Sequence, residues 1–232
     1  MSKRTYFILK LIAPLLFISF GCSLSPRTEE TENSASCETN STESTAVIED
    51  SNLFESNSEN NSSYIFFTND SKYITSNGYT FWFPAHESSA DSFETVEFSA
   101  YKESGRTESG YGVVFCNQDL DGKDFLLSLM INTRGQYIIG KVYDGEFSTI
   151  STWKTSSLLH KGIGIRNTVR IDYDDVKKLF IFYFNGYYAG DFSPVENVSI
   201  TGGKTGFVVV VSNLENFPKT PVKVIFEGVS GV

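Results

Sequence analysis

The stretch KLFIFYFNGYYAGDF, residues 178–192, decides the fold. Two runs rich in aromatic residues flank the pair Asn185-Gly186, and both residues of this pair tolerate the positive φ angles that a two-residue hairpin turn requires. The stretch therefore predicts an antiparallel hairpin with strands over 178–184 and 187–192.

Short aromatic and β-branched runs continue on both sides of this hairpin, separated by Gly, Asn and Asp. Further turn signals stand at 76–78, 133–135 and 144–145, and no run of comparable length has helical periodicity with caps at its ends. The pattern predicts an all-β, two-sheet antiparallel sandwich. The expected strands are 64–68, 72–74, 79–83, 92–101, 111–116, 125–132, 136–142, 147–153, 167–173, 178–184, 187–192, 205–211 and 222–229.

Two neighbouring strands are expected to differ in exposure. Every position of 179–184 is apolar, which favours a strand that is covered on both faces. Residues 169–173 alternate between apolar and polar side chains, which predicts one face in water.

Several short motifs resemble the concanavalin-like jelly roll. They are GYGVVF at 110–115, the hairpin over 125–139, NTVR at 167–170 and FYFNG at 182–186, and the resemblance spans 92–229. Within that group the chain is similar to the laminin-G-like and the 3-keto-disaccharide-hydrolase-type domains of bacterial envelope proteins. The resemblance implies a jelly roll, but it leaves the function open because this fold hosts lectins, hydrolases and adhesins alike.

The N-terminus has the order of a secretory signal peptide over residues 1–21. Lys3 and Arg4 precede a hydrophobic run that ends before Gly21-Cys22. A membrane span is the competing interpretation, but the unbroken apolar part is about half of the roughly 20 residues that a spanning helix needs.

The residues Ser19-Phe20-Gly21-Cys22 resemble a lipobox, in the relaxed form found in spirochaete lipoproteins. This resemblance implies that Cys22 is lipid-modified and becomes the first residue of the mature protein. The chain is then expected on the cell membrane or the outer membrane, with its domain facing the periplasm or the cell surface. An accidental cysteine after an ordinary signal peptide stays open as the alternative.

Residues 22–63 are expected to form a disordered tether, followed by a single domain over 64–232. The segment contains nine acidic residues and one arginine, a net charge of −8, with almost no large apolar residues. As a flexible coil it would span about 35 Å. The domain itself carries a net charge of −4 and no basic stripe, which excludes nucleic acid as a partner and disfavours electrostatic binding to an anionic membrane.

Three cysteines and two histidines, widely spaced, do not make a zinc site. Cys116 ends an apolar run and is expected to be a buried small residue. A bridge between Cys37 and Cys116 stays open in an oxidising compartment.

The sequence shows no convincing catalytic constellation, and we expect a protein that is not an enzyme. Glu94 and Glu97 are spaced to lie on opposite faces of a strand. Glu103 and Glu108 bracket a glycine loop, as in a solvated turn. The two histidines, His86 and His160, are expected in exposed loops without a nucleophile elbow.

The acidic pattern Asp119-x-Asp121-Gly122 resembles half of a calcium loop, so calcium is the one candidate cofactor. The glutamate that would complete such a loop is missing and Lys123 follows the glycine, so a plain turn is the favoured alternative.

Exposed aromatic residues are the remaining candidates for a binding site, because the apolar face of a sugar stacks on an aromatic ring. The candidates are Trp82, Tyr143, Tyr187 and Tyr188, whereas Trp153 is expected in the core. We therefore expect a lipid-anchored envelope protein whose domain binds a glycan or a protein. The alternatives are a carbohydrate-active hydrolase and a structural lipoprotein without a small ligand.

Overall fold

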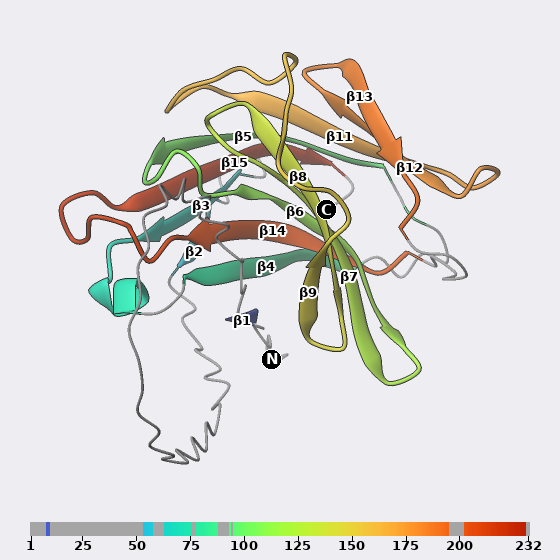
Figure 1. Ribbon diagram of the computed structural model, residues 1–232, viewed down its shortest axis with the longest axis horizontal. Coiled ribbons are helices and arrows are strands. Elements are labelled where there is room, and N and C mark those ends of the chain that lie inside the picture. Colours follow the sequence, from blue (N-terminus) through green and yellow to red (C-terminus); the bar gives the residue numbers. More distant parts are fainter. Residues whose placement is uncertain are drawn as a thin grey trace, which may run out of the picture.

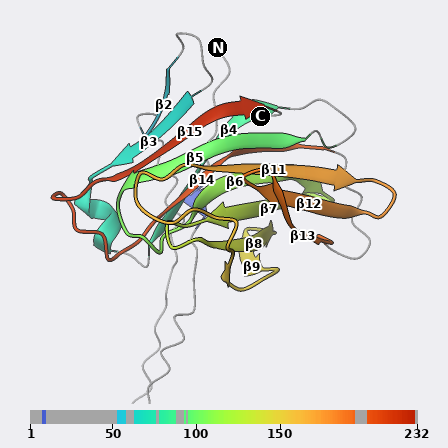
Figure 2. The same ribbon diagram turned by 90° about the horizontal axis from the view of Figure 1, so that it is seen from above.

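The computed structural model describes residues 8–9, 53–57, 63–75, 78–87, 93, 95–194 and 202–230. They form two sheets that pack face to face, in which every strand pair is antiparallel (Figures 1 and 2). Sheet A has the order β1-β4-β14-β6-β7-β8-β10, with β9 also pairing with β8, and sheet B has the order β13-β12-β11-β5-β15-β3-β2. The chain crosses repeatedly between the sheets, and the predicted two-sheet jelly-roll sandwich is confirmed.

The strands of sheet A are β1 (Ile8–Leu9), β4 (Tyr79–Glu87), β6 (Tyr111–Leu120), β7 (Lys123–Ile131), β8 (Gln136–Tyr143), β9 (Glu146–Thr149), β10 (Lys154–Thr155) and β14 (Lys204–Val211). Those of sheet B are β2 (Phe54–Asn57), β3 (Ser63–Thr68), β5 (Val96–Ser104), β11 (Asn167–Asp174), β12 (Leu179–Phe184), β13 (Tyr187–Phe192) and β15 (Val222–Ser230). One 3-10 helix, η1 (Ser71–Thr75), precedes β4.

The predicted hairpin turns have the expected backbone. Asn185 and Gly186 have φ angles of 52° and 82°, and Asp144 and Gly145 have 55° and 76°. Positive φ at both central residues matches the right-handed twist of the flanking strands. These residues therefore fix the register of β12 with β13 and of β8 with β9.

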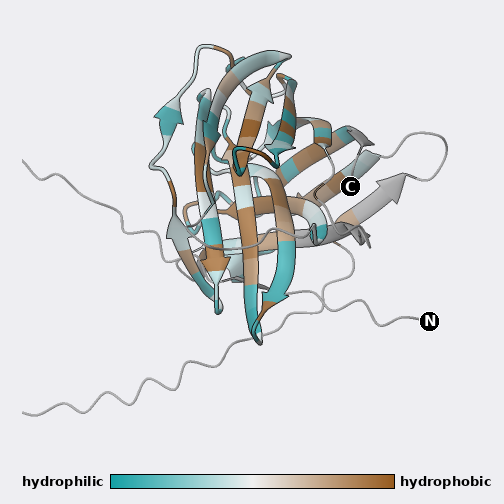
Figure 3. Cartoon of the chain, turned by 90° about the vertical axis from the view of Figure 1, so that its right-hand side faces the viewer, coloured by the Kyte–Doolittle hydropathy of each residue, from teal (hydrophilic) through white to brown (hydrophobic). Residues whose placement is uncertain are grey.

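Aromatic side chains join the two sheets into one core. Phe207 of sheet A stacks on Phe226 of sheet B with 4.3 Å between ring centroids, and Phe115 of sheet A meets Phe180 of sheet B at 5.2 Å. Figure 3 shows hydrophobic and hydrophilic bands alternating along the strands, as expected when one face of each sheet is buried.

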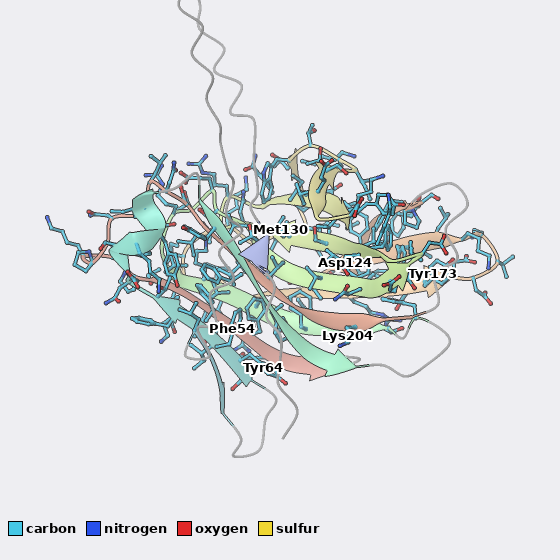
Figure 4. The ribbon with its side chains drawn as sticks, turned by 90° about the horizontal axis from the view of Figure 1, so that it is seen from below. Phe54, Tyr64, Asp124, Met130, Tyr173 and Lys204 are labelled. Carbon is cyan, nitrogen blue, oxygen red and sulfur yellow. The ribbon has the colours of Figure 1, made fainter. Side chains whose placement is uncertain are left out.

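This packing extends along the whole sandwich. Figure 4 shows Tyr173 on the right of the sandwich and Tyr64 near the middle of its lower side. The Tyr64 ring lies 5.1 Å from that of Phe207, and the Tyr173 ring lies 4.8 Å from that of Phe180. The sandwich therefore has one continuous inner core.

Three predictions about individual strands were wrong. Residues 72–74 belong to η1, because the Asp70 side chain accepts a hydrogen bond from the Lys72 N–H at 2.9 Å and favours a turn over a strand. The strand expected over 147–153 stops at Thr149, where two consecutive N–H groups, those of residues 150 and 151, donate to the Ile139 carbonyl and interrupt the ladder. Finally, β12 is buried on one face only, and its other face is half-buried.

The N-terminal predictions fall largely outside the described residues, including Cys22 and Cys37. β1 and β2 lie within the segments assigned to the signal peptide and the tether, and the domain boundaries stay predictions. Cys116 is a free cysteine and is fully buried, as predicted. Across the described ranges, no helix is long and apolar enough to cross a membrane.

Candidate functional site

Charged and aromatic side chains form a row across four strands on the outer face of sheet B. The register pairs Glu97 of β5 with Arg170 of β11, Arg170 with Tyr183 of β12, and Tyr183 with Tyr188 of β13. Directly paired residues project from the same face of a sheet. We call these four residues the tyrosine row, and Figure 1 shows its strands β11, β12 and β13 side by side.

Strand alternation directs the row outward. In β11 the side chains of Val169 and Ile171 are buried and that of Arg170, between them, is exposed. In β12 Phe182 and Phe184 are buried in the core, so that Tyr183 faces away from it. Site and core residues therefore alternate along the same two strands.

A β-bulge brings the two tyrosines together. Phe182 pairs with Gly190, whereas the next residue, Tyr183, pairs with Tyr188, so Ala189 is the extra residue of β13. Gly190 has a φ angle of 153°, and a Cβ there would lie 2.9 Å from the Phe182 ring. Only glycine lets β13 approach Phe182 this closely.

The side chains of Arg170, Tyr183 and Tyr188 contact one another in sequence across the row. The guanidinium carbon of Arg170 lies 5.6 Å from the centroid of the Tyr183 ring, within cation–π range. The rings of Tyr183 and Tyr188 meet edge to face at 6.2 Å. Tyr188 remains 58 % exposed, so its ring can still be covered by a ligand.

Two carboxylates fix the polar groups of the row. Asp172 accepts two hydrogen bonds from Arg170, at 3.0 Å from Nε and 2.9 Å from Nη2, and a third from the Thr95 hydroxyl at 2.9 Å. The hydrogen bond to Asp172 raises the pKa of Arg170 above its ordinary value. The Tyr188 hydroxyl donates to Asp191 at 2.5 Å, which raises the pKa of that phenol. Arg170 and Tyr188 are thus held in place before any ligand binds.

The four aromatic residues predicted to bind a ligand do not come together. Tyr188 belongs to the row, but Tyr187 pairs with the core residue Phe184 and is therefore on the opposite face of β13, with 68 % of its surface exposed. Tyr143 lies on sheet A, where its ring faces the Lys123 ammonium at 5.2 Å. Trp82 is also on sheet A, in β4, and its side chain is outside the described residues.

Sequence reasoning missed Arg170, Tyr183, Asp172 and Asp191. The alternation of 169–173 predicts one wet face and could have identified Arg170 and Asp172. Tyr183 was not considered as a site residue because 179–184 was predicted to be a strand that is buried on both faces. The bulge that pairs Tyr183 with Tyr188 has no signal in the sequence beyond Gly190.

The candidate calcium residues form a hairpin turn between β6 and β7. Asp121 and Gly122 are its two central residues, with φ angles of 57° and 81°, and Asp119 accepts a hydrogen bond from the Gly122 N–H at 2.6 Å. In the part of the chain that the structure describes, no group of three or more His, Cys, Asp or Glu side chains is arranged to hold a metal. The turn explains these residues by itself, and calcium binding stays a prediction.

The other candidate acids are engaged in ion pairs. Glu103 pairs with Lys223 at 2.7 Å, and Glu108 pairs with Arg106 at 2.5 Å and Arg134 at 3.1 Å. The side chain of His160 is exposed in a loop. His86 was predicted in a loop, but it lies in β4, where it pairs with Thr205 of β14. The side chain of His86 and the residue Glu94 lie outside the described residues.

The outer face of sheet A has a different character. Its described side chains include a second cluster of buried aliphatic residues, and Phe147 of β9 packs against them. Trp153 was expected in the core but is 37 % exposed, and its ring and the side chain of Met130 both lie next to Gly110. The described buried cluster on this face of sheet A is therefore aliphatic, whereas the outer face of sheet B carries the charged groups and tyrosines of the row. The cluster consists of Val114, Leu126, Met130, Ile138, Val142 and Val208.

No protein-family model and no curated protein matches the sequence. Several solved structures are similar to it. A carbohydrate-binding module, CBM66 from Bacillus subtilis, has 13% sequence identity and a TM-score of 0.49, with 76% of this chain and 88% of that chain covered. The β-glucanase of Bacillus licheniformis has 8% identity and a TM-score of 0.47, with 97% and 96% covered. Sheep galectin-11 has 11% identity and a TM-score of 0.40, with 67% and 97% covered.

Proposed function

We propose that this chain is a lipid-anchored cell-envelope protein that binds a glycan on the tyrosine row. The observation that carries the proposal is the exposed ring of Tyr188 beside Tyr183 and the fixed guanidinium of Arg170. A sugar can stack its apolar face on such a ring while its hydroxyls bond to the planar guanidinium and to a carboxylate. Because both polar groups are already oriented, little side-chain entropy is lost on binding.

The composition of the surface favours a glycan over a protein partner. The centre of a protein–protein interface is depleted in charged residues. Here Glu97, Arg170, Asp172 and Asp191 surround the two tyrosines, so charged groups reach the middle of the surface. Such an arrangement suits a ligand that carries many hydroxyl groups.

We further propose that the protein binds its glycan without cleaving it. A retaining or inverting glycosidase needs two carboxyl groups that are free to act on the sugar. Asp172 is occupied by Arg170 and Thr95, and Asp191 accepts the Tyr188 hydroxyl. The hydrolase alternative predicts turnover of a disaccharide panel that is abolished by Glu97→Gln. Detecting such turnover would refute the proposal of a binding protein without catalysis.

The binding test compares two exposed tyrosines. Tyr188→Ala should weaken glycan binding about two- to tenfold, because ring stacking contributes roughly 0.5–1.5 kcal/mol. Tyr143→Ala is the matched control, since Tyr143 is also exposed and also faces a cation, but on sheet A. A glycan array with both variants measures the effect. The proposal fails if no glycan binds, or if both variants lose binding equally.

The anchor is proposed on Cys22, on the basis of the lipobox resemblance and the acidic segment that follows it. Labelled palmitate should be incorporated into the wild-type protein and not into Cys22→Ser. Protease treatment of intact cells then tests the location. Removal of the domain without lysis would place it at the cell surface, and resistance would place it in the periplasm.

A further inference from the structure

The tyrosine row lies among more negative than positive charges. Glu97, Asp172 and Asp191 supply three carboxylates around the single guanidinium of Arg170, a local net charge of −2. Asp172 neutralises Arg170 directly through two hydrogen bonds. Glu97 and Asp191 therefore remain as uncompensated carboxylates on either side of the rings.

Neighbouring cations do not cancel this excess. Arg166, just before β11, forms an ion pair with Glu227, and Lys177, in the turn between β11 and β12, forms one with Asp174 at 3.4 Å. Each pair is neutral by itself. Glu97, paired in register with Arg170, forms no ion pair within the described ranges, and it acts on that guanidinium only through the longer-range Coulomb interaction.

We propose that this surface selects glycans that carry a free, protonated amino group, with Glu97 and Asp191 as the residues that determine the selectivity. The inference rests on the proposed glycan binding at the same row. A protonated amine placed about 4 Å from one solvated carboxylate gains roughly 1 kcal/mol, which corresponds to about a fivefold gain in affinity. A uronic acid at the same position would be repelled by a similar factor.

The test compares three disaccharides of one size with the full mature chain. They are the glucosamine disaccharide, its N-acetylated counterpart and a galacturonic acid disaccharide. Near pH 6 the free amine is protonated, as expected for an amine of this type. Short ligands at about 0.15 M salt limit non-specific attraction to the acidic N-terminal segment. Binding is followed by NMR titration of the assigned ring signals of Tyr183 and Tyr188, which report contact at the row.

We expect the glucosamine disaccharide to bind about fivefold more tightly than the acetylated form, and the galacturonic acid disaccharide to bind most weakly. Glu97→Gln should remove most of the preference, so that the free and the acetylated disaccharides bind with nearly equal affinity. Asp144→Asn is the matched control: it removes an exposed carboxylate from the β8–β9 turn of sheet A, and asparagine tolerates the same positive φ.

The outcomes separate the two proposals. Equal binding of the free and acetylated disaccharides, lost in both cases on Tyr188→Ala, would refute the selectivity and leave glycan binding intact. Absence of any shift in the ring signals with all three ligands would refute both. A preference that Asp144→Asn reduces as strongly as Glu97→Gln would reflect only the net charge of the chain, and it would also refute the selectivity.

Discussion

The side chain of Lys102 is fully buried, and raising the pH from 8 to 9 should therefore stabilise the protein. Its ammonium donates to the carbonyls of Arg106 at 3.1 Å and Ser109 at 2.8 Å, and the nearby carboxylate of Glu215 is 6 % exposed. Desolvation lowers the pKa of Lys102 from 10.5 to about 8. Holding the charged form in this site therefore costs about 3 kcal/mol near neutral pH.

The direction of the pH dependence follows from the number of protons that the folded and the unfolded states bind. Between pH 8 and 10.5 the unfolded chain keeps the proton on Lys102 and the folded protein loses it, so stability rises with pH in this window. From pH 8 to 9 the free energy of unfolding should increase by about 1 kcal/mol. Above about pH 9 the trend is opposed, because burial raises the pKa of the Cys116 thiol and the folded protein then keeps a proton that the unfolded chain releases.

Urea unfolding of three proteins at pH 7 to 10 measures this effect. The wild type should gain stability from pH 8 to 9, Cys116→Ala should continue to gain up to about pH 10, and Lys102→Met should show no gain. At pH 7 Lys102→Met should be at least as stable as the wild type, because it removes the same buried charge whose loss stabilises the folded protein at higher pH. A wild-type stability that falls steadily from pH 8 would refute the argument.

Three further substitutions test the fold and the calcium hypothesis. Phe226→Ala should cost about 3–5 kcal/mol in urea unfolding, because it empties the space against Phe207; a loss below 1 kcal/mol would contradict the inter-sheet core. Asn185→Ala should lower the thermal midpoint by several degrees, since it removes three hydrogen bonds to the adjoining loop and strand at a position with positive φ. Asp119→Ala should cost about 1 kcal/mol through the lost bond to the Gly122 N–H. If Asp119 and Asp121 bind calcium, added calcium should raise the wild-type midpoint and leave that of Asp119→Ala unmoved, and an unmoved wild type would refute the calcium hypothesis.

The hairpins could be predicted because their signals are local. Asp144-Gly145 and Asn185-Gly186 each contain two adjacent residues that tolerate positive φ, and the structure shows both in that conformation. The alternation of β11 likewise depends only on side-chain order within one strand. Two sheets pack face to face because most strands have one apolar face that must be buried.

The candidate site could be predicted only in part, because it depends on pairing between strands. Tyr187 and Tyr188 are equivalent in composition, and only the register of β13 with β12 places one above Tyr183 and the other on the opposite face. A shift of one residue exchanges the two faces. The burial of Lys102 was likewise unpredictable, since its partners are backbone carbonyls of a loop that the fold brings over it.

Because inward-facing and outward-facing residues alternate along the strands, substitutions in the row can change ligand binding without changing stability. In β11 and β12 each residue of the row is flanked by buried residues, so the core side chains lie on one face and the ligand-binding side chains on the other. Tyr188 is more than half exposed, and the Glu97 side chain makes no ion pair among the described residues, so neither Tyr188→Ala nor Glu97→Gln opens a cavity or leaves a buried charge unpaired. Both variants should therefore unfold within about 0.5 kcal/mol of the wild type. A loss of glycan binding at unchanged stability would then assign binding to the row itself, whereas an equal loss of both would mean that the row supports the fold.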